Sequence, residues 1–280
     1  MTTNTTVTSL REQAGEASQA LIAASPWEPL AGRLLLLCAR PPTVDWADAY
    51  GVPTLWAILD TPEARALPVE LRTPLLRDGS TLERIPASAD RPPIQMAVFT
   101  SEGIGRLIEG VTKRSLEIRW AARHAAPLHD PLHRFEMLAA AAARLPADAI
   151  ERVVRPLYVQ AAQALDALTT APLAERPDTA LILAGEAAAA TCRLACILEE
   201  GSHPPAEWLA PAARETRLGK RIASWLDDLA PAVGGDERAA RWIRDGGPGV
   251  LREAAAALRA EFAGRDWFND PLAQTIRPAR

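Results

Sequence analysis

The sequence predicts an α+β chain in which a small mixed α/β N-terminal part is followed by a mostly antiparallel helical bundle, so that helices predominate overall. Hydrophobic residues make up 48% of the 280 residues and aromatic residues only 5%, so Ala and Leu carry the apolar content and favour helices. Proline is frequent before Ser101, where apolar runs are short. From Ser101 onward, apolar residues recur with the period of a helix.

The N-terminal part contains one expected helix and three expected strands. The helix covers residues 9–23, where Ser9 can cap its first turn. Strands are expected over residues 33–39, 54–59 and 94–99, because these are short apolar or alternating runs bounded by Pro and Gly. The next helix begins at Ser101 with an acidic first turn.

Helices account for most of the remaining chain. Pro156 lies inside one of them and predicts either a kink or two separate helices, and Gly201 can serve as a C-terminal cap. We expect an α+β domain over residues 1–110, a helical bundle over 111–263 and a tail over 264–280. The expected helices are 118–125, 133–144, 147–168, 179–200, 205–215, 219–229, 236–244 and 249–262.

Composition excludes several classes of protein. The net charge of −4 and the pI near 5.7 argue against nucleic acid as a partner. We find no apolar run near the roughly 20 residues needed to cross a bilayer, and the N-terminus lacks the order of a signal peptide. Three cysteines without a CxxC spacing fit a reducing compartment. We therefore expect a cytoplasmic protein without a membrane partner, and the sequence predicts no cofactor.

Three of the four histidines cluster with an acidic residue in one short segment. His129 and His133 have the i, i+4 spacing of a helical metal pair, and with His124 and Asp130 they could bind a metal or perform acid–base chemistry. Pro131 interrupts this spacing, however, and the alternative is that Asp130 caps the helix that follows. We predict no metal ligands and keep His124, His129 and Asp130 as candidate catalytic residues.

The chain resembles the nucleotidyltransferase superfamily, of the kanamycin and lincosamide nucleotidyltransferase type with a helical C-terminal domain. The likeness consists of a strand leading into a capped helix over 94–110, a helix ending in an Asp-Pro turn over 120–131, and an inner helix with a Pro-Trp segment over 185–209. A helical segment carrying Leu157 and Tyr158 lies between them.

The chain departs from this family where the family binds metal. The family holds magnesium with an Asp-x-Asp or Asp-x-Glu pair after a Gly-Ser turn, and with a third carboxylate on a later strand. Here the first strand ends in Cys38 and Ala39, Asp45 and Asp48 have the wrong separation, and the later strand has no acid. The resemblance therefore implies a degenerate member of the superfamily, with residues 1–110 as its nucleotidyltransferase-like domain.

The resemblance also implies roles for particular side chains. Glu186 matches the inner-helix position where the kanamycin enzymes place a general base, so Glu186 is a further candidate catalytic residue. The rim of this helix carries Glu199, Glu200 and Glu207, which suits a cationic or neutral ligand. The candidate ligand-binding residues are Asp48, Arg119, Arg123 and Tyr158.

The expected function is that of a bacterial small-molecule transferase with altered chemistry, or of a pseudoenzyme that binds a ligand in secondary or antibiotic-related metabolism. Two alternatives stay open, and whether the chain is an enzyme is not decided. One is a non-catalytic helical interaction module whose Ala-rich faces support a homodimer. The other is a ribonuclease, because Arg119 and His124 resemble the Arg-x4-His pattern of HEPN-type helical ribonucleases. Arg114, Arg119 and Arg123 could equally form a solvated basic stripe.

Overall fold

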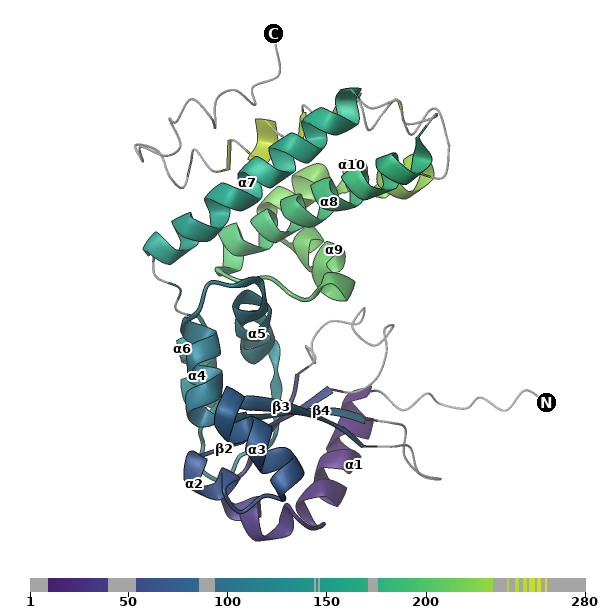
Figure 1. Cartoon of the computed structure of the whole chain (residues 1–280). Helices are drawn as coiled ribbons and strands as arrows, with labels where there is room; N and C mark the ends of the chain where they lie inside the picture. The colour runs from purple at the N-terminus through teal and green to yellow at the C-terminus, as the bar shows by residue number, and fades with distance from the viewer. Residues whose placement is uncertain are drawn as a thin grey trace, which may run out of the picture. The chain divides into compact units, whose positions relative to one another are not determined.

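The computed structural model of the chain confirms the predicted class: a mixed sheet with helices, followed by a helical region (Figure 1). The chain divides into two compact units, Met1–Arg144 and Leu145–Arg280. The structure describes residues 10–39, 54–85, 94–143, 145, 147–170 and 176–233, and within the next segment 241, 245, 246, 249, 250, 252–254, 256, 257 and 260.

The first unit is built on a five-stranded sheet in the order β3-β4-β2-β1-β5. β1 (Leu35–Cys38) is antiparallel to β2 (Thr54–Leu59), and β2 is parallel to β4 (Ile94–Thr100). The outer strands β3 (Ser80–Ile85) and β5 (Ala126–His129) each run antiparallel to their neighbour. Because β2 and β4 are parallel neighbours, both end at the same edge of the sheet.

The sequence predicted the three inner strands and missed the two outer ones. β3 alternates between half-buried and exposed residues and buries none of them fully, so it lacks the apolar run that marks β1 and β2. β5 contains Pro127, which reads as a helix stop in the sequence. A proline is tolerated in a strand at a sheet edge because no second neighbour needs its N–H.

Helices of the first unit pack on this sheet. The main core forms where α1 meets the sheet, and it includes Trp27, Leu36, Leu55 and Met96, all nearly inaccessible to solvent. The helices are α1 (Leu10–Ile22), η1 (Glu28–Arg33), α2 (Thr61–Ala64), α3 (Val69–Asp78), α4 (Ser101–Glu109), α5 (Lys113–His124) and α6 (Phe135–Ala143). The predicted domain boundary at residue 110 falls within this unit, between α4 and α5.

The start of α4 touches the turn before β3. Thr100 caps the helix one residue before the predicted start, since its Oγ1 accepts a hydrogen bond from the Gly103 N–H at 2.9 Å. A side chain on Gly103 would overlap the carbonyl group of Gly79, and Gly79 itself has a φ of +75°. Two glycines therefore allow the helix and the turn to approach each other closely.

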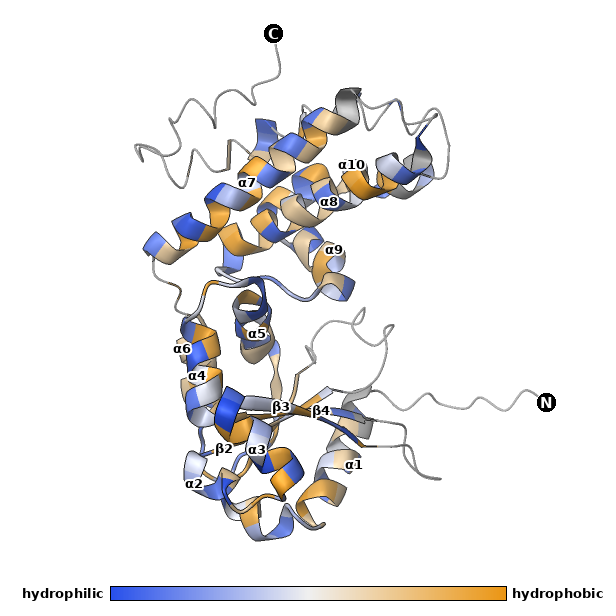
Figure 2. Cartoon of the chain, viewed as in Figure 1, coloured by the Kyte–Doolittle hydropathy of each residue, from blue (hydrophilic) through white to orange (hydrophobic). Residues whose placement is uncertain are grey.

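The described part of the second unit is mainly helical and contains α7 (Ala147–Thr170), α8 (Pro177–Glu200), α9 (Ala206–Glu215) and α10 (Arg217–Val233). Hydrophobic and hydrophilic residues alternate along them, as amphipathic helices require (Figure 2). α7 continues through Pro156 as one helix, so the alternative of two helices is wrong. Gly201 caps α8 as predicted: its φ is +68° and its N–H donates to the Ile197 carbonyl at 2.8 Å.

α8 is the central helix of this unit and packs against α7, α9 and α10. Over Leu181–Glu200 it is long and apolar enough to cross a membrane by length and composition alone, which the sequence analysis overlooked because charged residues interrupt the run. Half of that stretch is buried inside the unit. The core helix of a soluble protein has the same properties.

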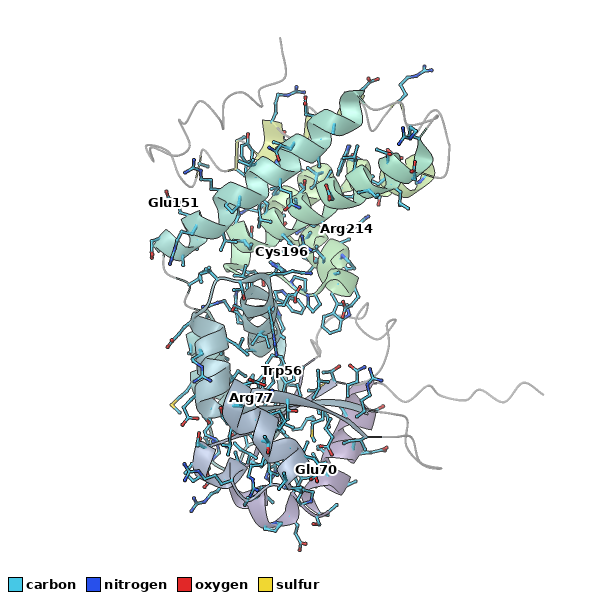
Figure 3. The ribbon with its side chains drawn as sticks, viewed as in Figure 1. Trp56, Glu70, Arg77, Glu151, Cys196 and Arg214 are labelled. Atoms are coloured by element: carbon cyan, nitrogen blue, oxygen red, sulfur yellow. The ribbon has the colours of Figure 1, made fainter. Side chains whose placement is uncertain are left out.

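The cysteines of α8 are buried thiols. Burial raises the pKa of Cys192 to about 12, although Arg214 and Arg193 lower it, and burial together with Cys192 and Glu200 raises the pKa of Cys196 well above its usual range. Cys196 lies on α8 and Arg214 on α9 (Figure 3). Both thiols are therefore protonated at neutral pH and behave as small hydrophobic groups.

A thiol reagent tests this burial. At pH 8, 5,5′-dithiobis(2-nitrobenzoate) should react with native Cys38, Cys192 and Cys196 far more slowly than with the urea-unfolded chain, because all three are buried. The free energy of unfolding should also fall as the pH rises above about 8.5, since the unfolded chain then loses thiol protons that the native state keeps. Equal reaction rates in the native and unfolded states would contradict the burial.

Two substitutions within α4 test the contact between its first turn and Gly79. Gly103→Ala should lower the free energy of unfolding by about 1–3 kcal/mol, because the new methyl group overlaps backbone atoms. Gly105→Ala is the matched control: it has open space around it and should raise stability by up to about 1 kcal/mol. Urea titration measures both, and equal effects of the two variants would contradict the close approach.

Candidate functional site

The predicted residues His129 and Asp130 lie where β5 ends. Asp130 caps the start of α6, since its Oδ1 accepts a hydrogen bond from the Arg134 N–H and its Oδ2 accepts one from the Phe135 N–H, both at 2.9 Å. Asp130 therefore bonds the first turn of the next helix, as the capping alternative expected, but that helix starts at Phe135 and not at Pro131. Arg134, which that alternative placed at the surface, is mostly buried. His129 Nε2 lies 2.7 Å from the Ala31 carbonyl oxygen, which ties β5 to η1.

Polar side chains gather at the edge where β2 and β4 end. Ser101 Oγ donates to Asp60 Oδ1 at 2.5 Å, and Arg134 Nη1 lies 3.2 Å from the same oxygen. Arg134 Nη2 also donates to the carbonyl of Arg33 at 2.5 Å. The sequence predicted a helix start at Ser101 but not the meeting of Asp60, Ser101 and Arg134. Their partners show that they hold the sheet edge together.

Arg119 lies inside the first unit. Its side chain is 1% exposed, and its guanidinium donates to the Ala142 carbonyl at 3.0 Å and to the Ile108 carbonyl. These carbonyls belong to the C-terminal turns of α6 and α4, so one side chain serves two helix ends. Burial lowers the pKa of Arg119, and the nearby charge of Arg123 lowers it further.

The other predicted residues are spread over both units. His124 stacks on Trp120 with ring centroids 4.5 Å apart. In the helical unit, Tyr158 is buried on α7 and Glu186 is exposed on α8. Asp48 lies outside the described residues. The catalytic and ligand-binding roles given to these side chains therefore stay predictions.

In the described part of the chain, no three His, Cys, Asp or Glu side chains are grouped so that they could hold a metal ion. Asp45, like Asp48, lies outside that part. The expectation that the family's acidic motif has been lost therefore stays a prediction.

A pocket of about 650 Å³ lies in the helical unit, and the sequence analysis missed it. We call it the cationic pocket. α8 and α10 contribute to its walls, together with Ala256, Ala257 and Ala260. Its lining residues are Ala195, Leu198, Glu199, Arg217, Leu218, Lys220, Arg221, Ala256, Ala257 and Ala260.

Cations outnumber carboxylates in this lining. Arg217 Nε lies 3.1 Å from Glu199 Oε2, and Arg221 Nη1 lies 2.9 Å from Glu253 Oε2. Among the residues that the structure describes, no ion pair involves Lys220. Counted over the described residues, the pocket therefore contains two arginines paired with carboxylates and one ammonium group, that of Lys220, without such a pair.

The three cations stand in the first two turns of α10. Thr216 Oγ1 accepts a hydrogen bond from the Gly219 N–H at 2.9 Å, which fixes the start of the helix. A helix N-terminus carries partial positive charge, so a cation without a paired carboxylate in the first turn destabilises the helix by a few tenths to about 1 kcal/mol. An anion bound beside Lys220 would offset this cost.

Sequence reasoning missed the pocket for a local reason. The predicted helix began at Gly219, which left Arg217 outside it. The acidic rim that includes Glu199 was expected to suit a cationic or neutral ligand. In the structure, Glu199 faces Arg217 across the gap between α8 and α10. The signal that could have found the site is the spacing of Arg217, Lys220 and Arg221, which places them on neighbouring positions of a helix.

Comparison with known proteins finds likeness among solved structures alone. No family model and no curated protein matches the chain. Among solved structures, it is similar to the crystal structure of a nucleotidyltransferase-like protein from Exiguobacterium sibiricum, with 12% identity and a TM-score of 0.40 over 94% of this chain and 87% of that one. An identity and a TM-score this low leave function to be argued from the residues.

Replacement of Arg119 tests its structural role. Arg119→Met should lower the free energy of unfolding by about 2–3 kcal/mol, because it leaves buried carbonyls without donors. Arg114→Met, on the exposed side of the same helix, should change it by less than about 0.5 kcal/mol. Similar unfolding midpoints in urea for both variants would contradict the assignment.

Proposed function

We propose that this chain is a binding protein for a small organic anion, which occupies the cationic pocket. Of the two functions that the resemblance implies, the proposal favours ligand binding over group transfer. It rests on one observation: three cations and one carboxylate line a cavity of about 650 Å³. That volume lies within the range of pockets that enclose small molecules.

The charge of the whole chain strengthens this interpretation. The chain carries a net charge of −4, so its average surface repels anions. A local excess of cations against that background attracts an anion to one place. The apolar lining, which includes Leu198 and Leu218, supplies surface that an organic molecule can cover.

The two lysines of the chain provide a matched test. Titration calorimetry should show saturable binding of naphthalene-2-carboxylate and much weaker binding of the neutral naphthalene-2-carboxamide. Lys220→Glu should weaken carboxylate binding by roughly tenfold or more, because it replaces attraction by repulsion. Lys113→Glu changes the net charge equally but alters an exposed pair with Glu117 in the other unit, so it should leave binding unchanged.

Two results would overturn the proposal. One is the absence of saturable carboxylate binding by the wild-type chain. The other is an equal loss of binding in Lys220→Glu and Lys113→Glu, which would assign the effect to overall charge. Circular dichroism and the urea midpoint would establish that both variants are folded.

A further inference from the structure

We infer that the natural ligand is an amphipathic monocarboxylate, with its carboxylate beside Lys220 and its apolar chain along the alanine-lined part of the cationic pocket. This inference rests on the proposed function and specifies the class of ligand. Its two parts, the charge of the head and the apolar nature of the body, depend on different residues.

The charge of the head follows from the pairing of the lining residues. Glu199 balances Arg217, and Glu253 balances Arg221. Within the described part of the chain, Lys220 then leaves about one positive charge for the ligand to neutralise. A carboxylate carries one negative charge at neutral pH, whereas a phosphate monoester carries about 1.5 to 2 and would leave an excess.

The apolar body follows from the rest of the lining. α10 supplies all three cations, whereas α8 and the segment at 256–260 supply Ala195, Leu198 and three alanines besides Glu199. Alanines keep the cavity open because their side chains end at Cβ. Among the described lining residues, polar side chains for a sugar or a nucleobase come from Glu199 and the cations alone. A hydrocarbon chain therefore fits the alanine-lined part of the pocket better.

The volume agrees with such a molecule. About 650 Å³ is far more than acetate or inorganic phosphate would fill, and it accommodates an aliphatic or aromatic chain with some ordered water. Each methylene group that leaves water on binding should strengthen affinity by about fourfold. The affinity of a series of straight-chain carboxylates therefore reports whether a tail is buried.

The experiment is a calorimetric titration of the full chain with acetate, butanoate, hexanoate and octanoate, and with octyl phosphate and octyltrimethylammonium. Affinity should rise by about threefold to fourfold per methylene along the carboxylates. Octanoate should bind more tightly than octyl phosphate, and the cation should not bind measurably. Lys220→Gln should weaken octanoate binding by about fivefold, with the effect shrinking as salt is added.

A substitution in the alanine-lined part of the pocket tests the contribution of the ligand's apolar chain independently of its carboxylate. Ala260→Phe fills part of the pocket from an exposed position, so the fold should tolerate it. It should weaken octanoate binding by at least about tenfold and change butanoate binding little. The urea midpoint checks folding, and Ala257→Leu provides a second, smaller filling of the same region.

The outcomes distinguish this inference from the proposed function. Affinity that is independent of chain length, or a preference for octyl phosphate, would overturn the monocarboxylate assignment while leaving anion binding intact. Failure of every anion in the series, together with failure of naphthalene-2-carboxylate, would overturn both. If octanoate bound to the Lys220→Gln variant as tightly as to the wild-type chain, the ligand carboxylate would not lie beside Lys220.

Discussion

Small side chains on α8 are the constraint on which the helical unit depends. α8 packs against three other helices, and its buried residues include Ala187, Ala190 and Cys192. Side chains of this size leave little between neighbouring backbones, so dispersion contacts replace large interlocking groups. The same choice of residues leaves room where α8 meets α10 and the segment at 256–260. The cationic pocket is the space that larger side chains would have filled.

Arginine serves different purposes in the two units. In the first unit, Arg119 and Arg134 point inward and donate to main-chain carbonyls at the ends of helices and strands. A guanidinium has five donors and no acceptor, so it can close several chain ends at once. In the helical unit, Arg217 and Arg221 are exposed and pair with carboxylates beside an open cavity. The burial and the partners of an arginine, rather than the residue type itself, therefore distinguish a structural arginine from one in the candidate site.

The sequence predicted the fold class because its strongest signals are local. Apolar runs mark β1 and β2, helical periodicity marks α7 and α8, and Gly201 marks a helix end. The outer strands gave no such signal: β3 buries little, and β5 contains a proline. β3 and β5 are strands because each pairs with an inner strand of the folded sheet. A short stretch of sequence does not reveal such a partner.

The candidate site was harder to predict than the fold. Its three cations come from one helix, but the carboxylates that pair with them come from elsewhere. Glu199 lies 18 residues before Arg217, and Glu253 lies on a later segment. Only the packing of helices shows which cation is left unbalanced. The histidine segment was more conspicuous in the sequence, yet Asp130 there caps a helix and His129 contacts a backbone carbonyl.

The scarcity of lysine has a practical consequence. Lys113 and Lys220 are the chain's only lysines, and each belongs to a different unit. An acylating reagent therefore finds two side-chain amines besides the α-amine, and peptide mass spectrometry can separate the products. Occupancy of the pocket can then be followed inside one molecule, in crude mixtures and without purified ligand, as the acylation of one lysine relative to the other.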